Sequence, residues 1–409
     1  MRLREHANKI IEASLAAAMP DTAVRSALEK ADFSDGKLVL IAAGKAGWQM
    51  AKAAYGLLGA RIDGGVVVTK YGHSRGSIGN LEIYEAGHPV PDVNSFRGTQ
   101  AALDAVSGLQ TRDTVLFLLS GGGSALFEKP LIPEADLRRV TGEMLASGAD
   151  ITEINTVRKR FSAVKGGRFA LACQPAQVFT IVLSDVLGDR LDMIASGPAY
   201  PDGSTAEEAC HIAEKYHLTL TEQMEQLLRV ETPKTLSNVQ THATGSVRQL
   251  CAAAEKKCRE LGYETLVLTD QLSCTARDAG VFLSNIAQLH AAGGRKMAFI
   301  AGGETVVHVT GKGLGGRNQE LALAAAPGIT GLNAAVFSVG SDGTDGPTDA
   351  AGGFVDGTTA ARLNTQGIRI SDMLADNDAY HALQKCSGLI ITGPTGTNVN
   401  DLSVLLIDG

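Results

Sequence analysis

Short apolar runs alternate with amphipathic stretches along the first half of the chain. Four of these runs end in glycine or polar residues: LVLIAAG at 38–44, GGVVVT at 64–69, TVLFLLSGGG at 114–123 and VFTIVLSD at 178–185. Apolar strands separated by helical patterns are typical of a parallel sheet that helices cover on both faces. We therefore predict a Rossmann-like, doubly wound and mostly parallel sheet domain in the first half of the chain.

A polar stretch at residues 231–246 interrupts this alternation and indicates a domain boundary near residue 235. After it, apolar runs and helical patterns resume. One run, TVVHVT at 305–310, alternates apolar and polar residues, which favours an antiparallel or half-exposed strand. We therefore expect two α/β domains, residues 1–235 and residues 236–409, the second with a mixed sheet.

Composition excludes several classes of partner. The net charge of -7 makes nucleic acid an unexpected ligand, because binding a phosphate backbone requires a clustered excess of Lys and Arg. The six cysteines form no C-x-x-C pair, so neither a zinc site nor a disulfide framework is indicated. The N-terminal stretch repeats at helical spacing with Glu12 inside it, and no apolar run reaches the ~20 residues that cross a bilayer. We expect a cytoplasmic protein without a membrane partner.

The segment TGKGLGGRNQE at 310–320 contains a glycine fingerprint. Gly311, Gly313 and Gly316 match G-x-G-x-x-G, with which dinucleotide-binding folds begin, and Asp342 could be the acid that contacts the ribose. The alternating strand ahead of the fingerprint argues against that interpretation, because a dinucleotide fold has a central apolar strand there. Arg317 opens the following helix, where the helix dipole already places positive charge, so an anion between the two is favoured.

Two further turns are candidates for anion binding. Lys45 follows Gly44 at the start of a predicted helix. The third apolar run ends in three glycines, whose amides can converge on an anion, followed by a serine hydroxyl at a helix start. The candidate phosphate-binding residues are Gly44, Gly121, Gly122, Gly123, Ser124, Gly313, Gly315 and Gly316.

Acidic residues follow two of the predicted strands. Asp185 and Asp189 follow the run at 178–185, and Asp342, Asp345 and Asp349 follow AAVFSVG. The spacing does not match an EF-hand, but Mg²⁺ in a phosphoryl-transfer site requires only one or two carboxylates. The candidate metal ligands are Asp185, Asp342 and Asp345, although turn capping accounts for some of these aspartates.

The segment EINTVRKRFSAVKGGRFA at 153–170 has the pattern of an amphipathic helix ending at Gly166 and Gly167. Its polar face is either solvated or, beside a cleft, binds a carboxylate. That face comprises Asn155, Arg158, Ser162 and Lys165. The candidates for binding a substrate carboxylate are Arg158, Lys165 and Ser184.

Nine motifs, taken in order, resemble those of the class II glycerate 2-kinases over roughly residues 5–407. They are AAGKAGWQMA, AGHPVPD, LSGGGSAL, INTVRKRFSAVKGGRFA, SDVLGDRLDMIASGP, GGET, GKGLGGRNQELALA, SDGTDGPTDAAGG and TGPTGTNVNDL. The resemblance implies a Rossmann-like domain, a C-terminal domain called MOFRL and an active-site cleft between them. It also implies transfer of the γ-phosphate of ATP to the 2-hydroxyl of D-glycerate, with Mg²⁺ or another divalent cation as cofactor.

The same resemblance implies that Lys45 and Arg317 are the two catalytic cations. We expect them to face each other across the cleft, because phosphoryl transfer needs positive charge around the equatorial oxygens. Asp189 is the candidate that accepts the proton of the attacking hydroxyl. The expected partners are D-glycerate and ATP, and the sequence leaves a homo-oligomer open.

Two alternatives stand beside the kinase. An NAD(P)H-dependent hydroxypyruvate reductase would use the glycine fingerprint, but it explains neither Lys45 nor Arg317. It would also need a proton donor, for which His88 in AGHPVPD is a candidate, although a histidine in a Pro-flanked loop is more often structural. A non-catalytic sensor of phosphorylated sugars could keep every anion-binding turn, and it would bind ligand without turnover.

Overall fold

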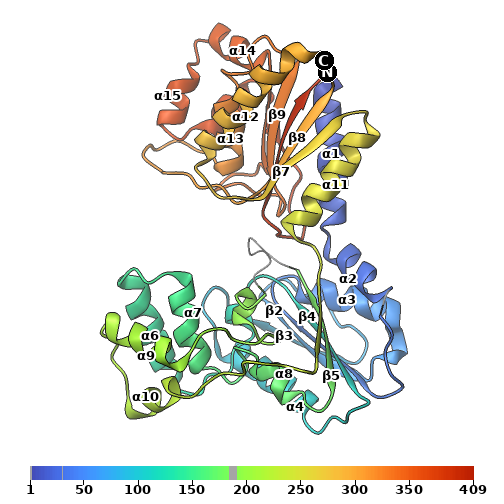
Figure 1. Ribbon diagram of the computed structural model, residues 1–409, viewed down its shortest axis with the longest axis vertical. Helices are drawn as coiled ribbons and strands as arrows, with labels where there is room; N and C mark the ends of the chain where they lie inside the picture. The colour runs from blue at the N-terminus through green and yellow to red at the C-terminus, as the bar shows by residue number, and fades with distance from the viewer. Residues whose placement is uncertain (1, 30, 184–190) are drawn as a thin grey trace. The chain divides into compact units, whose positions relative to one another are not determined.

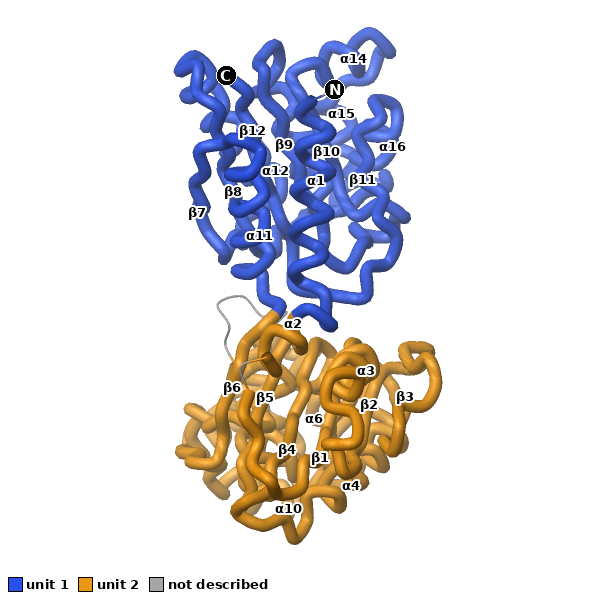
Figure 2. Tube along the Cα trace, turned by 90° about the vertical axis from the view of Figure 1, so that its right-hand side faces the viewer, with its two compact units in different colours: residues 1–22, 245–409 blue, residues 23–244 orange. Residues whose placement is uncertain are grey.

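The chain folds into two compact units, which Figure 2 colours separately. The computed structural model describes residues 2–29, 31–183 and 191–409. One unit holds residues 23–244, and the other holds residues 1–22 together with residues 245–409. None of the described helices combines the length and the apolar character needed to span a membrane.

The first domain was expected to span residues 1–235, whereas the observed unit begins at residue 23 and ends at residue 244. Strand β6 (Val239–Ala243) is the last strand of that unit's sheet, so the unit extends to Thr244. Helix α1 (Arg2–Ala17) belongs to the other unit, where it lies beside α11 (Val247–Glu260) (Figure 1). Its apolar stripe is buried there, which is why an N-terminal segment packs with the C-terminal half.

The sheet of the 23–244 unit has six parallel strands in the order β3-β2-β1-β4-β5-β6. The strands before β6 are β1 (Leu38–Ala43), β2 (Gly64–Lys70), β3 (Leu81–Ala86), β4 (Thr114–Leu119) and β5 (Gln177–Val182). The predicted doubly wound parallel sheet is therefore confirmed. The strand order reverses between β1 and β4, and ligands of such sheets bind at the carboxyl ends of the strands at this point.

Helices cover both faces of this sheet, as the wholly buried β1 and β4 require. The α-helices of this unit are α2 (Pro20–Leu28), α3 (Gly47–Leu58), α4 (Val93–Val106), α5 (Gly123–Leu126), α6 (Glu134–Ala146), α7 (Ile151–Arg160), α8 (Arg168–Ala172), α9 (Ala206–Lys215) and α10 (Glu222–Leu228). The first three residues of α2 belong to the other unit. Helices α2 and α3 pack on one face, and α4 and α8 pack on the other. Helices α6, α7, α9 and α10 share a separate apolar cluster.

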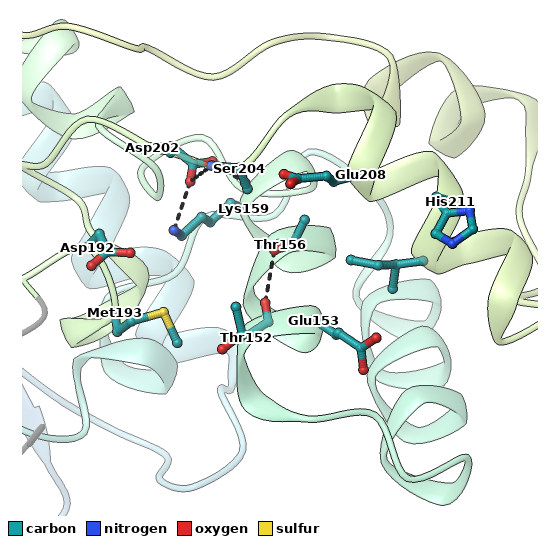
Figure 3. A pocket seen from close by; sticks show the side chains of 12 residues that line it. Thr152, Glu153, Thr156, Lys159, Asp192, Met193, Asp202, Ser204, Glu208 and His211 are labelled. Carbon is teal, nitrogen blue, oxygen red and sulfur yellow. Dashed lines mark hydrogen bonds and ion pairs between the residues drawn. The ribbon is translucent and has the colours of Figure 1, made fainter.

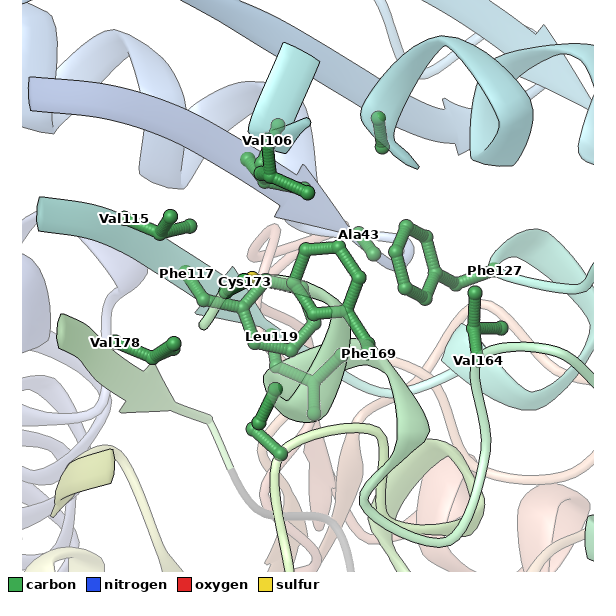
Figure 4. Close-up of a cluster of buried hydrophobic side chains, with 14 of the residues drawn as sticks. Ala43, Val106, Val115, Phe117, Leu119, Phe127, Val164, Phe169, Cys173 and Val178 are labelled. Atoms are coloured by element: carbon green, nitrogen blue, oxygen red, sulfur yellow. The ribbon is translucent and has the colours of Figure 1, made fainter. Parts of the chain in front are cut away.

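Three phenylalanines form the centre of the core on the α4 side of the sheet (Figure 4). The ring centroids of Phe117 and Phe169 lie 4.8 Å apart, and those of Phe127 and Phe169 lie 5.0 Å apart in an edge-to-face arrangement. Phe117 lies on β4, and Phe127 directly follows α5. Burial of these aromatic rings therefore fixes the turn that leads from β4 into α5.

The predicted helix over residues 153–167 is wrong in its C-terminal half, because α7 ends at Arg160. Residues 161–163 instead pair with residues 129–131: the amide of Leu131 donates to the carbonyl of Phe161 at 2.8 Å. These bonds compete with the helical pattern, so the chain leaves the helix before the two glycines that were expected to end it.

The sheet of the other unit is mixed, as expected, in the order β11-β10-β9-β12-β8-β7. Its strands are β7 (Glu264–Leu272), β8 (Met297–Gly303), β9 (Ala334–Gly340), β10 (Gly352–Asp356), β11 (Leu389–Ile390) and β12 (Asp401–Ile407). Strands β7 and β8 are parallel, whereas β12 runs antiparallel to both β8 and β9. The start of β12 therefore lies at the ends of β8 and β9.

Helices α1 and α11 pack on one face of this mixed sheet, and α12 (Ala276–His290) and α13 (Arg317–Ala325) pack on the other. Three short helices complete the unit: α14 (Thr359–Thr365), α15 (Ile370–Ala375) and α16 (Ala379–Lys385). The strand predicted at 305–310 is wrong. Within it only Val306 forms a bridge, to Thr275, and the amide of Thr310 donates to the side chain of Asn377 instead.

Candidate active site

The loops after β1 and β4 meet at the point where the strand order reverses. The amide of Lys45 donates to the carbonyl of Gly121 at 2.8 Å, and the amide of Ala46 donates to Oγ of Ser120 at 3.0 Å. The carbonyl of Gly44 accepts a bond from Oγ1 of Thr69. These bonds place the candidate lysine and the triple-glycine turn side by side.

Gly122 makes room for two basic side chains. Its φ is +85°, and a Cβ there would lie 3.1 Å from Cγ of Lys45 and 3.1 Å from Cδ2 of His88. A side chain at this position would therefore press on both residues and adopt an unfavourable backbone conformation. Lys45 is half-buried, and no carboxylate among the residues described in the structure pairs with it.

Basic side chains gather at the carboxyl ends of β1, β2 and β3. Lys70 ends β2, His73 follows it, and His88 follows β3. Burial, together with the charges of Lys45, Lys70 and His73, holds the pKa of His88 below its ordinary value of 6.5. This end of the sheet is therefore suited to an anion before any ligand arrives.

Ser124 belongs to a small group of polar side chains beside the glycine turn. Its Oγ lies 3.4 Å from Oγ of Ser196, which in turn donates to Oδ1 of Asn155 at 2.8 Å. Ala195 and Ser196 have φ values of 51° and 62°, a left-handed conformation that costs non-glycine residues energy. Strained backbone of this kind is most often found at functional sites.

Lys165 lies beneath the turn and is fully buried. Its Nζ donates to the carbonyl of Ser124 at 2.9 Å and to those of Phe127 and Ala195 at 3.2 and 3.3 Å. Burial lowers the pKa of Lys165 to about 8. The three carbonyls use all three donors of the ammonium group, so Lys165 holds the turn in place and has none left for a substrate carboxylate.

Arg158 and Glu128 complete this buried charge cluster. Nη2 of Arg158 donates to the carbonyl of Ser124 at 3.2 Å and lies 3.7 Å from Glu128, whose carboxylate also lies 3.6 Å from Nζ of Lys165. Neither oxygen of Glu128 has a hydrogen-bond partner among the residues that the structure describes. The side chain of Arg158 is 15% exposed, so it differs from Lys165 in reaching solvent. Sequence reasoning missed Glu128. The pattern that could have identified it is an acidic residue directly after the apolar residues ALF at 125–127.

Three further candidates, Ser184, Asp185 and Asp189, lie outside the described residues.

In the other unit, Arg317 is held by two carboxylates. Its Nε lies 2.6 Å from Oδ2 of Asp401 and its Nη2 lies 3.1 Å from Oδ1, while Nη1 lies 2.9 Å from Oε1 of Glu304. Burial disfavours the charged form of Arg317. The interactions with Asp401 and Glu304 have a larger effect, so the pKa of Arg317 is raised above its ordinary value. The side chain remains 34% exposed. Glu304 and Asp401 occur in the motifs GGET and TGPTGTNVNDL, but the sequence alone did not reveal that they contact Arg317.

Asp345 caps the helix that Arg317 opens. Its two carboxylate oxygens accept the amides of Asn318 and Gln319 at 3.1 and 2.9 Å. Burial raises the pKa of Asp345 to about 6. The carboxylate occupies the helix N-terminus at which a phosphate was expected, and the helix amides leave it poorly placed to hold a metal. A Cβ on Gly316 would overlap Asp345, which gives that glycine a packing role.

The rest of the glycine fingerprint is also engaged within the protein. The amide of Gly313 donates to the carbonyl of Asp376 at 2.8 Å, and the amide of Leu314 donates to the carboxylate of Asp378 at 3.0 Å. A Cβ on Gly315 would lie 3.3 Å from the amide of Ala379. The fingerprint therefore allows close packing against residues 376–379, and in this structure the amide of Gly313 is not available to a phosphate.

Asp342 follows β9, and its Oδ1 accepts the amide of Thr344 at 2.9 Å. The side chain is half-buried, and no bond to its Oδ2 occurs within the described residues. Those residues contain no group of three or more His, Cys, Asp and Glu side chains that could hold a metal ion. Any cation site here would therefore rest on one or two carboxylates.

A separate cavity of about 340 Å³ lies between α7 and α9 (Figure 3). Nζ of Lys159 and Oδ1 of Asp202 form a buried ion pair at 3.0 Å on its wall. Asp202 also accepts a bond from Thr232 and contacts Arg160. Because these charges satisfy one another, the cluster ties α7 to the loop before α9 and offers little to a ligand.

Comparison with known proteins identifies the family of the chain. A model described as a domain of unknown function, DUF4147, matches residues 6–229, and the MOFRL family model matches residues 297–401. A D-glycerate 2-kinase from Thermotoga maritima is 52% identical over 412 residues, covering 99% of this chain and 98% of the relative. The chain belongs to the glycerate 2-kinase family.

Other relatives agree with this family and explain the competing label. A crystal structure of a glycerate kinase from Thermotoga maritima superposes with a TM-score of 0.96 at 52% identity, covering 99% of each chain. A putative hydroxypyruvate reductase from Agrobacterium vitis is 40% identical over 387 residues, covering 91% of this chain and all of the relative. The reductase label therefore occurs within the glycerate 2-kinase family.

Proposed function

We propose that the protein is an ATP-dependent glycerate 2-kinase, which transfers the γ-phosphate of ATP to the 2-hydroxyl of D-glycerate and releases 2-phosphoglycerate and ADP. The observation that carries this proposal is the placement of Lys45, without a counter-ion among the described residues, against the triple-glycine turn where the parallel strands reverse order. The full-length similarity to a D-glycerate 2-kinase at 52% identity supports the same activity.

Lys45 supplies positive charge to the transferring phosphoryl group. Phosphoryl transfer requires alignment of the attacking and leaving oxygens and stabilisation of charge on the equatorial oxygens, with little covalent help from the protein. An ammonium group that lacks a carboxylate partner keeps its charge free for this purpose. The adjacent turn, with Gly121 and Gly122, offers amides and a position close to Lys45 for a phosphate or a carboxylate.

Arg317 supplies the second cation. The bonds that its guanidinium makes to the carboxylates of Asp401 and Glu304 fix its orientation before substrate arrives, so little reorganisation is needed during the reaction. Three of its five donors are used by these carboxylates, and the exposed part of the guanidinium remains for phosphoryl oxygens. We propose Lys45 and Arg317 as the catalytic cations on this basis.

Arg158 is the better of the two described candidates for the carboxylate of D-glycerate. Its side chain is partly exposed and lies beside Ser124, whereas the ammonium of Lys165 is fully buried and bonded to three carbonyls. Asn155 and Ser196 lie next to the same turn and add hydrogen-bonding groups. We therefore propose Arg158 for the substrate and assign Lys165 to positioning the turn.

Mg²⁺ is the proposed cofactor, and Asp342 is the described residue that fits it best. One of its oxygens accepts a bond from Thr344 and the other has no bond within the described part of the chain, whereas both oxygens of Asp345 accept bonds from the helix amides. Bound with ATP, Mg²⁺ would neutralise charge on the phosphate oxygens. Asp342 would hold the ion through a single carboxylate, which is sufficient when phosphates and water supply the remaining ligands.

The test is an assay of purified protein with D-glycerate and MgATP, following ADP release and the position of the new phosphate. The kinase predicts ADP and 2-phosphoglycerate in equal amounts, and Lys45→Ala should remove most of the turnover. A hydroxypyruvate reductase would instead oxidise NADH in the presence of hydroxypyruvate. A sensor would bind substrate without releasing ADP.

A further inference from the structure

The imidazole of His88 makes no hydrogen bond within the described part of the chain, although it is half-buried at the proposed site. A Cβ on Gly122 would lie 3.1 Å from Cδ2 of His88 and 3.3 Å from its Nε2. The same Cβ would lie 3.1 Å from Cγ of Lys45. Both side chains thus flank one point on the glycine turn. The ring of His88 is therefore a neighbour of the lysine proposed to contact the transferring phosphoryl group.

A histidine kept for packing normally has its ring nitrogens bonded to protein or water. His73, by contrast with His88, shows this behaviour, because its Nδ1 lies 2.9 Å from the carbonyl of Lys45. His88 has a donor and an acceptor that nothing in the described structure uses. Its ring is thus available to a ligand.

The charges around His88 favour its neutral form. They come from Lys45 after β1, from Lys70 at the end of β2 and from His73 in the loop that follows β2. Burial and these three basic groups lower the pKa of His88. At neutral pH the ring therefore keeps a lone pair that can accept a proton.

We propose that His88 is a further catalytic residue, the general base that accepts the proton of the attacking 2-hydroxyl of D-glycerate. This inference rests on the proposed kinase function. It assigns the proton to a described residue at the glycine turn, whereas the earlier candidate, Asp189, lies outside the described residues.

The proposed step balances as follows. The 2-hydroxyl oxygen forms a bond to the γ-phosphorus while the bond from that phosphorus to the β,γ-bridging oxygen breaks, and the bridging oxygen leaves with the electron pair as part of ADP. The hydroxyl proton moves to the unprotonated ring nitrogen of His88. The imidazolium returns this proton to water after 2-phosphoglycerate leaves. Phosphate charge next to Lys45 offsets the positive charge that builds up when His88 is protonated.

The first test compares His88→Gln with the wild type over a range of pH. Glutamine has similar hydrogen-bonding groups but cannot accept the proton, so kcat should fall by about 10²-fold or more. In the wild type, activity should fall as pH drops through the pKa of His88, because the protonated ring is no longer a base. This acid limb should be absent from the variant. His211→Gln, an exposed histidine on α9, is the matched control and should leave the profile unchanged.

The second test does not depend on turnover. The ring signals of His88 in ¹⁵N-histidine-labelled protein, assigned with His88→Gln, should titrate below pH 6.5 in the free wild type. Lys45→Ala should raise that pKa, because one of the depressing charges is removed.

Three results would overturn the proposal: kcat of His88→Gln within about threefold of the wild type, an unchanged acid limb in this variant, or a pKa of 6.5 or higher for His88 in the free protein. A wild-type protein that forms no 2-phosphoglycerate would overturn the proposed function itself, and it is distinguished from these results because the titration of His88 is measured without substrate.

Discussion

Asp401 holds the guanidinium of Arg317 through two hydrogen bonds, from Nε to Oδ2 at 2.6 Å and from Nη2 to Oδ1 at 3.1 Å. Asp401 opens β12 and Arg317 opens α13, so a strand start and a helix start are joined by one bidentate pair. This geometry fixes both the direction and the plane of the guanidinium, which a single contact could not do.

We expect Asp401→Asn to lower kcat by about 10²-fold with little change in fold, because the guanidinium loses one of the bonds that orient it and small misplacements are costly in catalysis. Arg317→Lys should be similarly impaired, since lysine keeps the charge but lacks the planar fork. Steady-state kinetics with thermal unfolding as a check on folding would measure both variants.

Asp372→Asn is the control for this prediction. Asp372 pairs with Arg369 at 2.6 Å in the same unit, but both side chains are exposed, so the loss should be small. If Asp401→Asn were as active as Asp372→Asn, orientation of Arg317 by Asp401 would have no part in the reaction.

The glycine turn can be tested with two alanine variants that share the same backbone strain. Gly122 and Gly148 have φ values of 85° and 77°, so Gly122→Ala and Gly148→Ala should each lose about 1 kcal/mol of stability. Gly148 faces open space, whereas a Cβ on Gly122 would press on Lys45 and His88. Only Gly122→Ala should therefore lose activity as well. Equal activity of the two variants would refute the role given to the turn.

Glu128 should be important for stability because it is the buried counter-ion of two cations. Glu128→Gln leaves Lys165 and Arg158 without that charge, and breaking a buried pair in this way typically costs about 3 kcal/mol or more. Glu134→Gln, which affects an exposed pair with Arg138 in the same unit, should cost less than about 1 kcal/mol. Urea unfolding of the two variants measures the difference, and similar losses would show that burial of the cluster is unimportant.

Glu153 makes stability depend on pH in the acid range. Hydrogen bonds from Lys215 and Tyr216 lower the pKa of Glu153 from 4.5 to about 2, so the folded state favours the ionised carboxylate. The resulting stabilisation is present above pH 4.5 and is lost as pH falls from 4.5 towards 2. Because Lys215 is exposed, we expect Glu153→Gln to cost no more than about 1 kcal/mol at pH 7.

Urea unfolding of Glu153→Gln and the wild type at about pH 7, 5, 4 and 3 checks this behaviour. The difference between the two proteins should shrink steadily below pH 4.5. A constant difference from pH 7 to pH 3 would mean that the charge of Glu153 is not responsible.

The sequence was sufficient to predict the central strands of both units and to single out Lys45 and Arg317 at the starts of helices. Strands β1 and β4 are buried along their whole length, and that burial is visible as uninterrupted apolar runs. Lys45 stood out because a cation at the start of a helix is unfavourable without an anion. These features depend on neighbouring residues in the chain, which is why they can be recognised without a structure.

The contacts that change the interpretation of the glycine fingerprint join segments far apart in the sequence. Asp345 reaches the start of α13 from another loop, and Asp376 bonds to the amide of Gly313. The same glycine spacing allows close approach to a phosphate or to a protein segment, so the pattern alone does not distinguish them. Helix α7 ends early for a similar reason, since the pairing of Leu131 with Phe161 replaces helical bonds.

The most direct test of the central claim is a single incubation of the purified protein with D-glycerate, MgATP and NADH, followed by ³¹P NMR, ADP release and NADH absorbance. The kinase account predicts ADP and 2-phosphoglycerate in equal amounts with NADH unchanged. Phosphate on the 3-hydroxyl, or no ADP together with oxidation of NADH when hydroxypyruvate replaces D-glycerate, would contradict it.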